Sequence, residues 1–88
     1  MNTRHAIKIL DTFAYAVWSG DKSFEIRKND RGYQKGDEVV FEVIEADGHP
    51  APTHPLNRKS YEITYVLSGY GLSDGYCVFG IRPQEGRR

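Results

Sequence analysis

The sequence contains one cysteine in 88 residues, Cys77, and this scarcity excludes several kinds of structure. A single thiol cannot form an internal disulfide, and a zinc site with four cysteine ligands is impossible. Small secreted domains are typically rich in disulfides, so we expect a reducing, cytoplasmic compartment. No histidine lies close to Cys77 in the sequence, and we expect a buried, unreactive thiol.

Long apolar runs and an excess of one charge are also missing. The apolar run at residues 14–18 extends only to Phe13, far short of the roughly 18 residues needed to cross a bilayer. The first five residues contain no apolar signal segment. Twelve basic and twelve acidic side chains give a formal net charge of +0. We therefore expect neither a membrane nor duplex DNA as a partner, because duplex binders carry a strongly basic surface.

Strong helix formers are few in this sequence. Ala, Leu and Met total 10 residues, whereas Val, Ile, Thr, Phe, Tyr and Trp total 27, which favours β-structure. Val, Ile, Leu and Phe make up about 23% of the chain, a share above the disordered range. The chain is too short for two ordinary domains. We predict a single domain over residues 1–88, with an ordered core over about 5–82 and a flexible tail at 83–88.

Apolar periodicity predicts one short helix and five strands. Asp11 is a candidate N-cap and Gly20 stands where a left-handed C-cap belongs, so the helix is expected over residues 12–19. The predicted strands cover residues 5–10, 23–28, 38–45, 59–67 and 76–82. A long loop at 46–58 and a glycine-rich loop at 68–75 separate the last three. This order predicts an α+β, mainly β fold: a small, curled, mostly antiparallel β-barrel of about five strands with one short helix after the first strand.

The same patterns predict which side chains face the core. Phe13 and Val17 belong to one apolar stripe of the helix. The strand at 38–45 is largely apolar on both faces, which is typical of a central strand. Tyr61 and Tyr65 fall on the core-facing side of their strand and are interpreted as packing residues.

Charged residues alternate with apolar ones in the strand after the helix. Phe24 and Ile26 are expected to anchor this strand in the core, which places Glu25 and Arg27 on its opposite face, just after Lys22. Two cations beside one carboxylate would keep the acid ionised and leave spare hydrogen-bond donors, and the planar fork of arginine suits a phosphate or a base edge. The plainer interpretation is a solvated face whose charges pair weakly. In a small barrel, however, an inward-facing charged stripe would line a mouth.

Four of these residues follow the spacing G-x-K-x-x-E-x-R: Gly20, Lys22, Glu25 and Arg27. Directly after a first helix, this arrangement resembles the ASCH (activating signal cointegrator homology) domain, a relative of the PUA RNA-binding barrels. Residues 5–9, 24–31, 36–37 and 63–76 also resemble a small bacterial and phage ASCH-like subfamily. The resemblance covers roughly residues 5–82.

The resemblance implies a PUA-like β-barrel with a cleft between helix and barrel, where Lys22, Glu25 and Arg27 match the family's cleft residues. Such domains are expected to bind RNA or modified nucleosides. Some relatives are small hydrolases that deacetylate N-acetylated cytidine with a lysine, a threonine three positions later and a distant glutamate. Glu25 stands here where that threonine is needed, and Ser23 is the nearest hydroxyl, so this activity does not carry over.

Further side chains extend the candidate nucleotide site. Between residues 20 and 35, five cations outnumber three acids, a small local surplus that suits a short single strand or a single nucleotide. Tyr33 and Tyr70 fall in predicted loops, where exposed rings can stack on unpaired bases, although a plain surface position explains them equally well. The candidate binding residues are Lys22, Ser23, Glu25, Arg27, Lys28, Arg31, Tyr33 and Tyr70.

The histidines give no metal signature. His49 and His54 lie in the long loop near Asp47, but their spacing matches no zinc pattern, so we predict a solvated loop with neither metal nor cofactor. His5 is the first residue of the first predicted strand, and the sequence leaves two roles open for it, a structural one or a place at the rim of the cleft.

Three functions remain as hypotheses. The first is a binding module that holds RNA, a nucleotide or a nucleoside with Lys22, Glu25 and Arg27. The second is a small hydrolase acting on a modified nucleoside or RNA, with Lys22 as the activating base or oxyanion partner and Glu25 as the proton carrier. The third is a non-catalytic protein-interaction factor of phage or mobile-element origin. The sequence leaves the ligand and the oligomeric state open.

Overall fold

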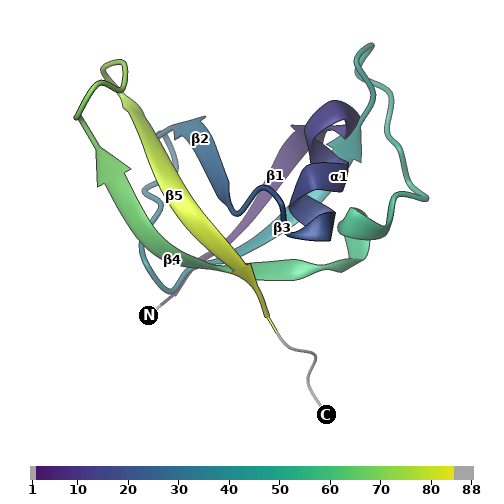
Figure 1. The fold of residues 1–88 in the computed structure, drawn as a ribbon, viewed down its shortest axis with the longest axis horizontal. Helices are drawn as coiled ribbons and strands as arrows, with labels where there is room; N and C mark the ends of the chain where they lie inside the picture. Colours follow the sequence, from purple (N-terminus) through teal and green to yellow (C-terminus); the bar gives the residue numbers. More distant parts are fainter. Residues whose placement is uncertain (1, 85–88) are drawn as a thin grey trace.

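The computed structural model describes residues 2–84, which form a five-stranded sheet curled into a half-barrel, with one α-helix after the first strand (Figure 1). In chain order the elements are β1 (Arg4–Leu10), α1 (Asp11–Ser19), β2 (Phe24–Lys28), β3 (Glu38–Ile44), the 3₁₀ helix η1 (Pro55–Arg58), β4 (Ser60–Ser68) and β5 (Tyr76–Pro83). The predicted α+β, mainly β class is confirmed. No helix among these residues has the length and apolar character required to span a membrane.

The strand order in the sheet is β1-β3-β4-β5-β2, so the first two strands of the chain lie at its two edges. The β1–β3 pair is parallel, and the other three pairs are antiparallel. Because the sheet curls, the free edges of β1 and β2 face each other across the opening of the half-barrel (Figure 1). Helix α1 stands beside this opening and packs on β1, β3 and η1.

Helix α1 follows the prediction except at its start and in its buried face. Gly20 adopts the left-handed conformation at φ 93° and caps the C-terminus as expected. Asp11 is the first helical residue and not the N-cap, because Leu10 occupies that position with no side-chain hydrogen bond. The buried residues are Ala14 and Val17, whereas Phe13 is 49% exposed. Phe13 instead lines the opening of the half-barrel, because the face of α1 that packs on β1, β3 and η1 is the one that carries Ala14 and Val17.

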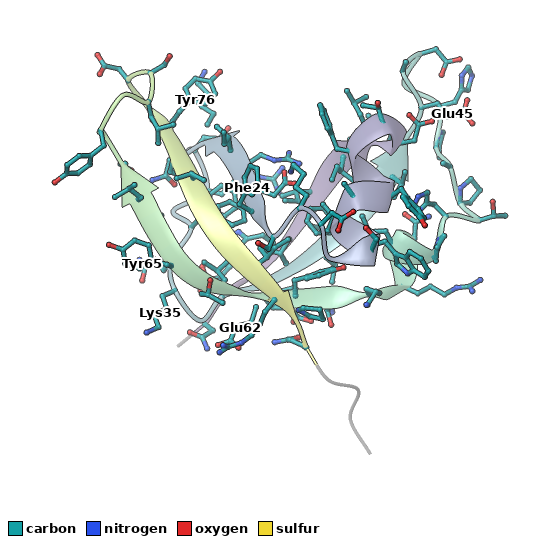
Figure 2. All side chains as sticks on the ribbon, in the orientation of Figure 1. Phe24, Lys35, Glu45, Glu62, Tyr65 and Tyr76 are labelled. Atoms are coloured by element: carbon teal, nitrogen blue, oxygen red, sulfur yellow. The ribbon has the colours of Figure 1, made fainter. Side chains whose placement is uncertain are left out.

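The alternation of buried and exposed side chains along strand β4 changes phase partway along the strand. Tyr61 and Ile63 point into the core, but the register shifts between Ile63 and Tyr65, and beyond this bulge the phase is inverted. Tyr65 is therefore 65% exposed on the outer side of β4, and its predicted core position is wrong (Figure 2). Gly80 on β5 makes room for the bulge, since a Cβ there would lie 2.5 Å from Thr64 Oγ1.

The segment at 46–58 contains no long strand, as predicted, but it is anchored at several points. Pro50 forms an isolated bridge with Ile44, and η1 buries Leu56 completely. The Asn57 side chain accepts a hydrogen bond from the amide of Val43 and donates one to a backbone carbonyl of the loop. At the other end of the chain, most of the predicted flexible tail, 85–88, lies outside the described residues.

Candidate functional site

Strand β2 faces the opposite way from the sequence prediction. Glu25 is 4% exposed, whereas Phe24 and Ile26 are 43% and 53% exposed. The cause is the register with β5, which pairs Glu25 with Phe79 and Ile26 with Val78. Directly opposed residues share a face, and Phe79 belongs to the core, so Glu25 must point inward with it. The charged stripe of β2 therefore lines the interior of the half-barrel, at its open side.

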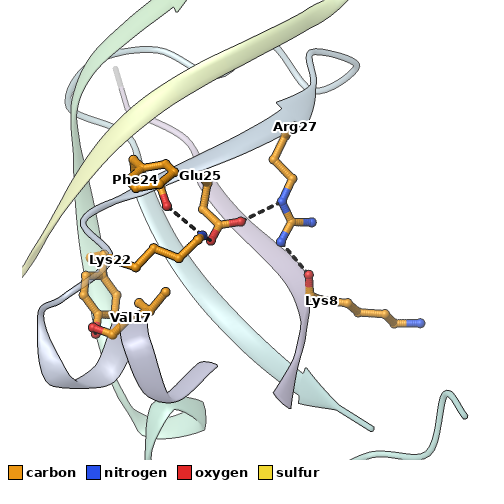
Figure 3. A network of polar contacts seen from close by, with 7 residues as sticks. Lys8, Val17, Lys22, Phe24, Glu25 and Arg27 are labelled. Carbon is orange, nitrogen blue, oxygen red and sulfur yellow. Dashed lines mark hydrogen bonds and ion pairs between the residues drawn. The ribbon is translucent and has the colours of Figure 1, made fainter. Parts of the chain in front are cut away.

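Glu25 is held by two cations inside this opening (Figure 3). Lys22 Nζ donates to Oε2 at 2.6 Å and Arg27 Nε donates to Oε1 at 3.0 Å. A buried carboxylate is costly unless it is both paired and hydrogen-bonded, and here each oxygen has a charged donor. The three side chains carry one net positive charge, and we call them the Lys22–Glu25–Arg27 triad.

Lys22 makes three further contacts that orient its ammonium group. Nζ donates to the carbonyl of Phe24 at 2.9 Å and lies 4.9 Å from the centre of the Phe24 ring and 5.7 Å from that of Phe13. These two rings favour a cation between them. An ammonium has three N–H donors and two are used within the protein, so one is left for a ligand.

Two arginines, one on β2 and one in the turn after it, reach the free edge of β1. Arg27 Nη2 donates to the carbonyl of Lys8 at 2.6 Å, and Arg31 Nη1 donates to the carbonyl of Ala6 at 2.7 Å. The carbonyl of Thr3 bonds to the amide of Glu38, so odd-numbered residues of β1 pair with β3 and even-numbered ones turn toward β2. The arginines thus bond to β1 carbonyls that lack a strand partner. The gap between the edges stays open as a cleft.

The cleft has a volume of about 530 Å³ and lies between β1, α1 and β2. That volume falls within the range of roughly 300–1,000 Å³ typical of small-molecule sites. Its walls mix aromatic and aliphatic side chains with charged ones: Lys8, Ile9, Leu10, Phe13, Lys22, Glu25, Ile26, Arg27, Lys28 and Tyr76. Among the described residues that line it, four are cations and only Glu25 is an acid.

The remaining candidate residues are divided between the cleft and other places. Lys28 lines the cleft. The exposed Ser23, the hydroxyl nearest to Lys22 in the sequence, lines a different hollow. Tyr70 is 92% exposed in the loop after β4 and does not line the cleft. Tyr76, which is not among the candidate residues predicted from the sequence, does line it. Arg31 lies outside the lining and contacts the edge of β1.

Tyr33 is not a surface stacking residue, and that prediction is wrong. Its side chain is 5% exposed, with ring centres 4.7 Å from both His5 and Phe79. Burial raises the pKa of the Tyr33 hydroxyl. The turn after β2 folds back because the Asn29 side chain accepts a hydrogen bond from the Tyr33 amide, and this carries the ring into the core. Its position in a loop gave no indication of this.

A second buried carboxylate, Asp37, anchors the start of β1. His5 Nε2 lies 2.8 Å from Asp37 Oδ2, and the amides of Thr3 and Gln34 donate to the same carboxylate at 3.1 and 3.0 Å. Burial favours a raised pKa for Asp37, but these hydrogen bonds outweigh it and the pKa lies below its ordinary value. Asp37 is not among the site residues predicted from the sequence, and its contact with the buried ring of His5 gives His5 a structural role.

The loop histidines have local partners. His54 Nδ1 accepts a hydrogen bond from the Leu56 amide, and His49 Nδ1 lies 2.8 Å from Asp47 Oδ2. Within residues 2–84, no three side chains of His, Cys, Asp or Glu come together as metal ligands would. Cys77 is fully buried, as predicted, and burial raises the pKa of its thiol.

A family model described as a domain of unknown function (DUF3850) matches residues 4–81, a span that includes the triad and both edges of the cleft. That description names no ligand and no reaction. No curated protein matches the sequence.

Proposed function

The chain belongs to this family of domains of unknown function, and we propose that it is a nucleotide-binding module of the PUA-like kind that its motif resembles. Its ligand is an unpaired RNA nucleotide or a free nucleotide held in the cleft between β1, α1 and β2. The observation that carries the proposal is the buried Lys22–Glu25–Arg27 triad at a cation-rich, partly aromatic cleft of about 530 Å³.

The polar side of the cleft favours a ligand rich in hydrogen-bond acceptors. Arg27 uses Nε for Glu25 and one Nη2 hydrogen for Lys8, which leaves three of its five N–H donors. Lys22 keeps one donor, and Lys8 and Lys28 add positive charge at the walls. Phosphate oxygens and the carbonyl oxygens of a base match such donors. Glu25 acts by holding the two cations in place, since each of its oxygens already accepts a charged hydrogen bond.

The apolar walls suit a planar ring. Phe13 from α1, Ile26 from β2 and Tyr76 from β5 all line the cleft and are between 40% and 53% exposed. Half-exposed aromatic faces beside cations are the recurring elements of sites for unpaired bases, which stack on rings and are steered by positive charge. A single nucleotide fits this volume, whereas a duplex would require an extended basic surface that a chain of +0 net charge does not supply.

Hydrolysis is the weaker candidate because the cleft offers no hydroxyl nucleophile beside Lys22. Ser23 lines another hollow, and Tyr76 is the only hydroxyl-bearing side chain among the described residues that line the cleft. An acyl transfer of the relatives' kind needs such a nucleophile within hydrogen-bond reach of its base. We therefore propose binding without turnover.

The test is an amide NMR titration of the full chain with each of the four ribonucleoside 5′-monophosphates and with N-acetylcytidine. We expect saturable shifts at residues 8–10 and 22–28, without new product signals. Absence of shifts in that region at millimolar nucleotide would overturn the proposal. Release of acetate would replace it with the hydrolase, and a stable complex with a host protein that covers the cleft would support the interaction factor instead.

Two lysine variants provide a matched comparison. Lys8→Gln removes a cation from the cleft wall without touching a Glu25 hydrogen bond, and Lys35→Gln removes an exposed cation from the turn before β3, outside the cleft lining (Figure 2). We expect Lys8→Gln to weaken monophosphate binding about threefold to tenfold and Lys35→Gln to leave it unchanged. Equal effects would show that the shifts report nonspecific charge and not this site.

A further inference from the structure

Two further hollows adjoin the cleft, one on each side. The first, which we call the helix-end hollow, has a volume of about 410 Å³ and lies between the end of α1 and strands β4 and β5. Its lining includes Trp18, Lys22, Ser23, Lys59, Ile81 and Arg82. The second, the loop hollow, has a volume of about 360 Å³ and is formed mainly by the loop between β4 and β5, with Asp74 and Tyr76 in its lining. Lys22 borders both the cleft and the helix-end hollow, and Tyr76 borders both the cleft and the loop hollow.

The two hollows differ in charge. The helix-end hollow has three cations, Lys22, Lys59 and Arg82, and its described lining contains no acid. The loop hollow has the opposite character, because Asp74 is the one charged residue in its described lining. A strand that leaves the cleft carries a phosphate on each side of its base, so the potential attracts it toward the helix-end hollow and repels it from the loop hollow.

The helix-end hollow also offers an aromatic face. Trp18 lines this hollow and is 39% exposed, and its ring centre lies 5.8 Å from that of Tyr15. Lys59 Nζ lies 5.9 Å from the centre of the Tyr61 ring, which keeps this cation at the hollow's edge. Arg82 is paired with Glu62 at 3.3 Å, but the arginine side chain is 66% exposed and keeps donors directed at solvent. A ring next to two cations is what a second unpaired nucleotide needs.

We infer that the ligand is a single strand of at least two nucleotides, which passes from the cleft across Lys22 into the helix-end hollow. There one base stacks on Trp18, and Lys59 and Arg82 contact its phosphate. The inference rests on the proposed function and sharpens it, because it assigns a minimum length and a path to the ligand.

Trp18 supplies a direct readout, since it is the only tryptophan of the chain and does not line the cleft. We expect uridine 5′-monophosphate to shift cleft amides without quenching tryptophan fluorescence. The dinucleotide UpU with a 5′-phosphate should quench it and bind about tenfold more tightly, which is the expected gain from one stacked base. The ribo and deoxy forms of this dinucleotide, run side by side, separate an RNA ligand from a DNA ligand.

Variants distinguish the path of the strand. Lys59→Gln and Arg82→Gln should each weaken dinucleotide binding about threefold and reduce the slope of log affinity against log salt by about 0.7. Neither should change monophosphate binding, because neither residue lines the cleft. Lys35→Gln serves as the control for lost charge. Asp74→Asn should leave dinucleotide affinity unchanged if the strand avoids the loop hollow.

The outcomes separate the inference from the proposed function. Cleft shifts with the monophosphate, together with a dinucleotide that binds no more tightly and leaves Trp18 unquenched, would overturn the inference and leave the proposed function intact. A rise in dinucleotide affinity in Asp74→Asn, with no effect of Lys59→Gln, would overturn it by sending the strand toward the loop hollow. Absence of binding by both ligands would remove the proposed function and the inference together.

Discussion

Glu25 and Asp37 are both carboxylates with 4% of their surface exposed, yet their surroundings differ in a way that separates function from folding. Asp37 accepts hydrogen bonds from His5 and from two backbone amides, all drawn from segments that must meet for β1 to join β3. Glu25 is held by two flexible cations that border an open cleft and keep donors to spare. A buried acid surrounded by fixed donors stabilises the fold, whereas the cations around Glu25 keep donors free at the cleft, which is why we propose that Glu25 organises a binding surface.

The largest effect should come from removing the Asp37 carboxylate. Asp37→Ala leaves the His5 ring, which is 4% exposed, and the amides of Thr3 and Gln34 without their acceptor. The buried His5 donor without its acceptor costs about 1–3 kcal/mol and the two part-buried amides cost less, so the free energy of unfolding should fall by about 2–4 kcal/mol. Urea denaturation followed by circular dichroism measures this loss. A loss below about 1 kcal/mol would show that the Asp37 carboxylate contributes no more to stability than that of Glu25.

Glu25→Gln should cost less stability and change binding more. The side chains of Lys22 and Arg27 are 21% and 25% exposed, so both cations can turn to water when their carboxylate is gone. We expect a loss of about 1 kcal/mol in the free energy of unfolding. Without Glu25 the described lining of the cleft carries cations and no acid, so nucleotide affinity should decline more steeply as salt is added.

Calorimetric titrations of this variant at two salt concentrations test that expectation, with Asp37→Asn as the matched carboxylate control. Asp37→Asn lies outside the cleft lining, and its salt dependence should equal that of the unmodified protein. A Glu25→Gln protein with an unchanged salt dependence would contradict the assignment of Lys22 and Arg27 as ligand-facing cations.

The same comparison shows how far the sequence could be interpreted. Strand boundaries and the Gly20 cap were predicted to within one or two residues, because alternation and turn chemistry are local signals. The G-x-K-x-x-E-x-R spacing also indicated the triad that the structure brings together, since Lys22, Glu25 and Arg27 are at most five residues apart. These features depend only on near neighbours along the chain.

Local patterns could not predict which face of a strand is buried, nor which residues far apart in the sequence come into contact. The pair of Arg27 with the Lys8 carbonyl spans 19 residues, and that of His5 with Asp37 spans 32. The inward position of Glu25 depends on its pairing with Phe79, and the outward position of Tyr65 depends on a bulge one residue long. A shift of one residue in register inverts every side chain of a strand, so periodicity defines two faces without saying which one is buried.

The smallest expected effect concerns the free energy of unfolding at low pH. The pKa of folded Asp37 lies below its ordinary value of 3.8, because the hydrogen bonds from His5 and the two amides outweigh the opposing effect of burial. A depressed pKa contributes stability that is fully present above the unfolded-state pKa and is lost as the pH falls through the folded-state pKa. The unfolding free energy of the unmodified protein should therefore decline below about pH 4, and Asp37→Asn should lack this part of the decline.

Urea midpoints of the two proteins between pH 5 and pH 2 measure the difference, in which carboxylates common to both, Glu25 included, largely cancel. The gap between the two proteins should narrow as the pH falls, because protonation gives Asp37 the same neutral character that asparagine has at every pH. A gap that stays constant would mean that Asp37 keeps its ordinary pKa and holds His5 no more firmly than a neutral acceptor does. The contrast with Glu25 would then rest on the exposure of the partners alone.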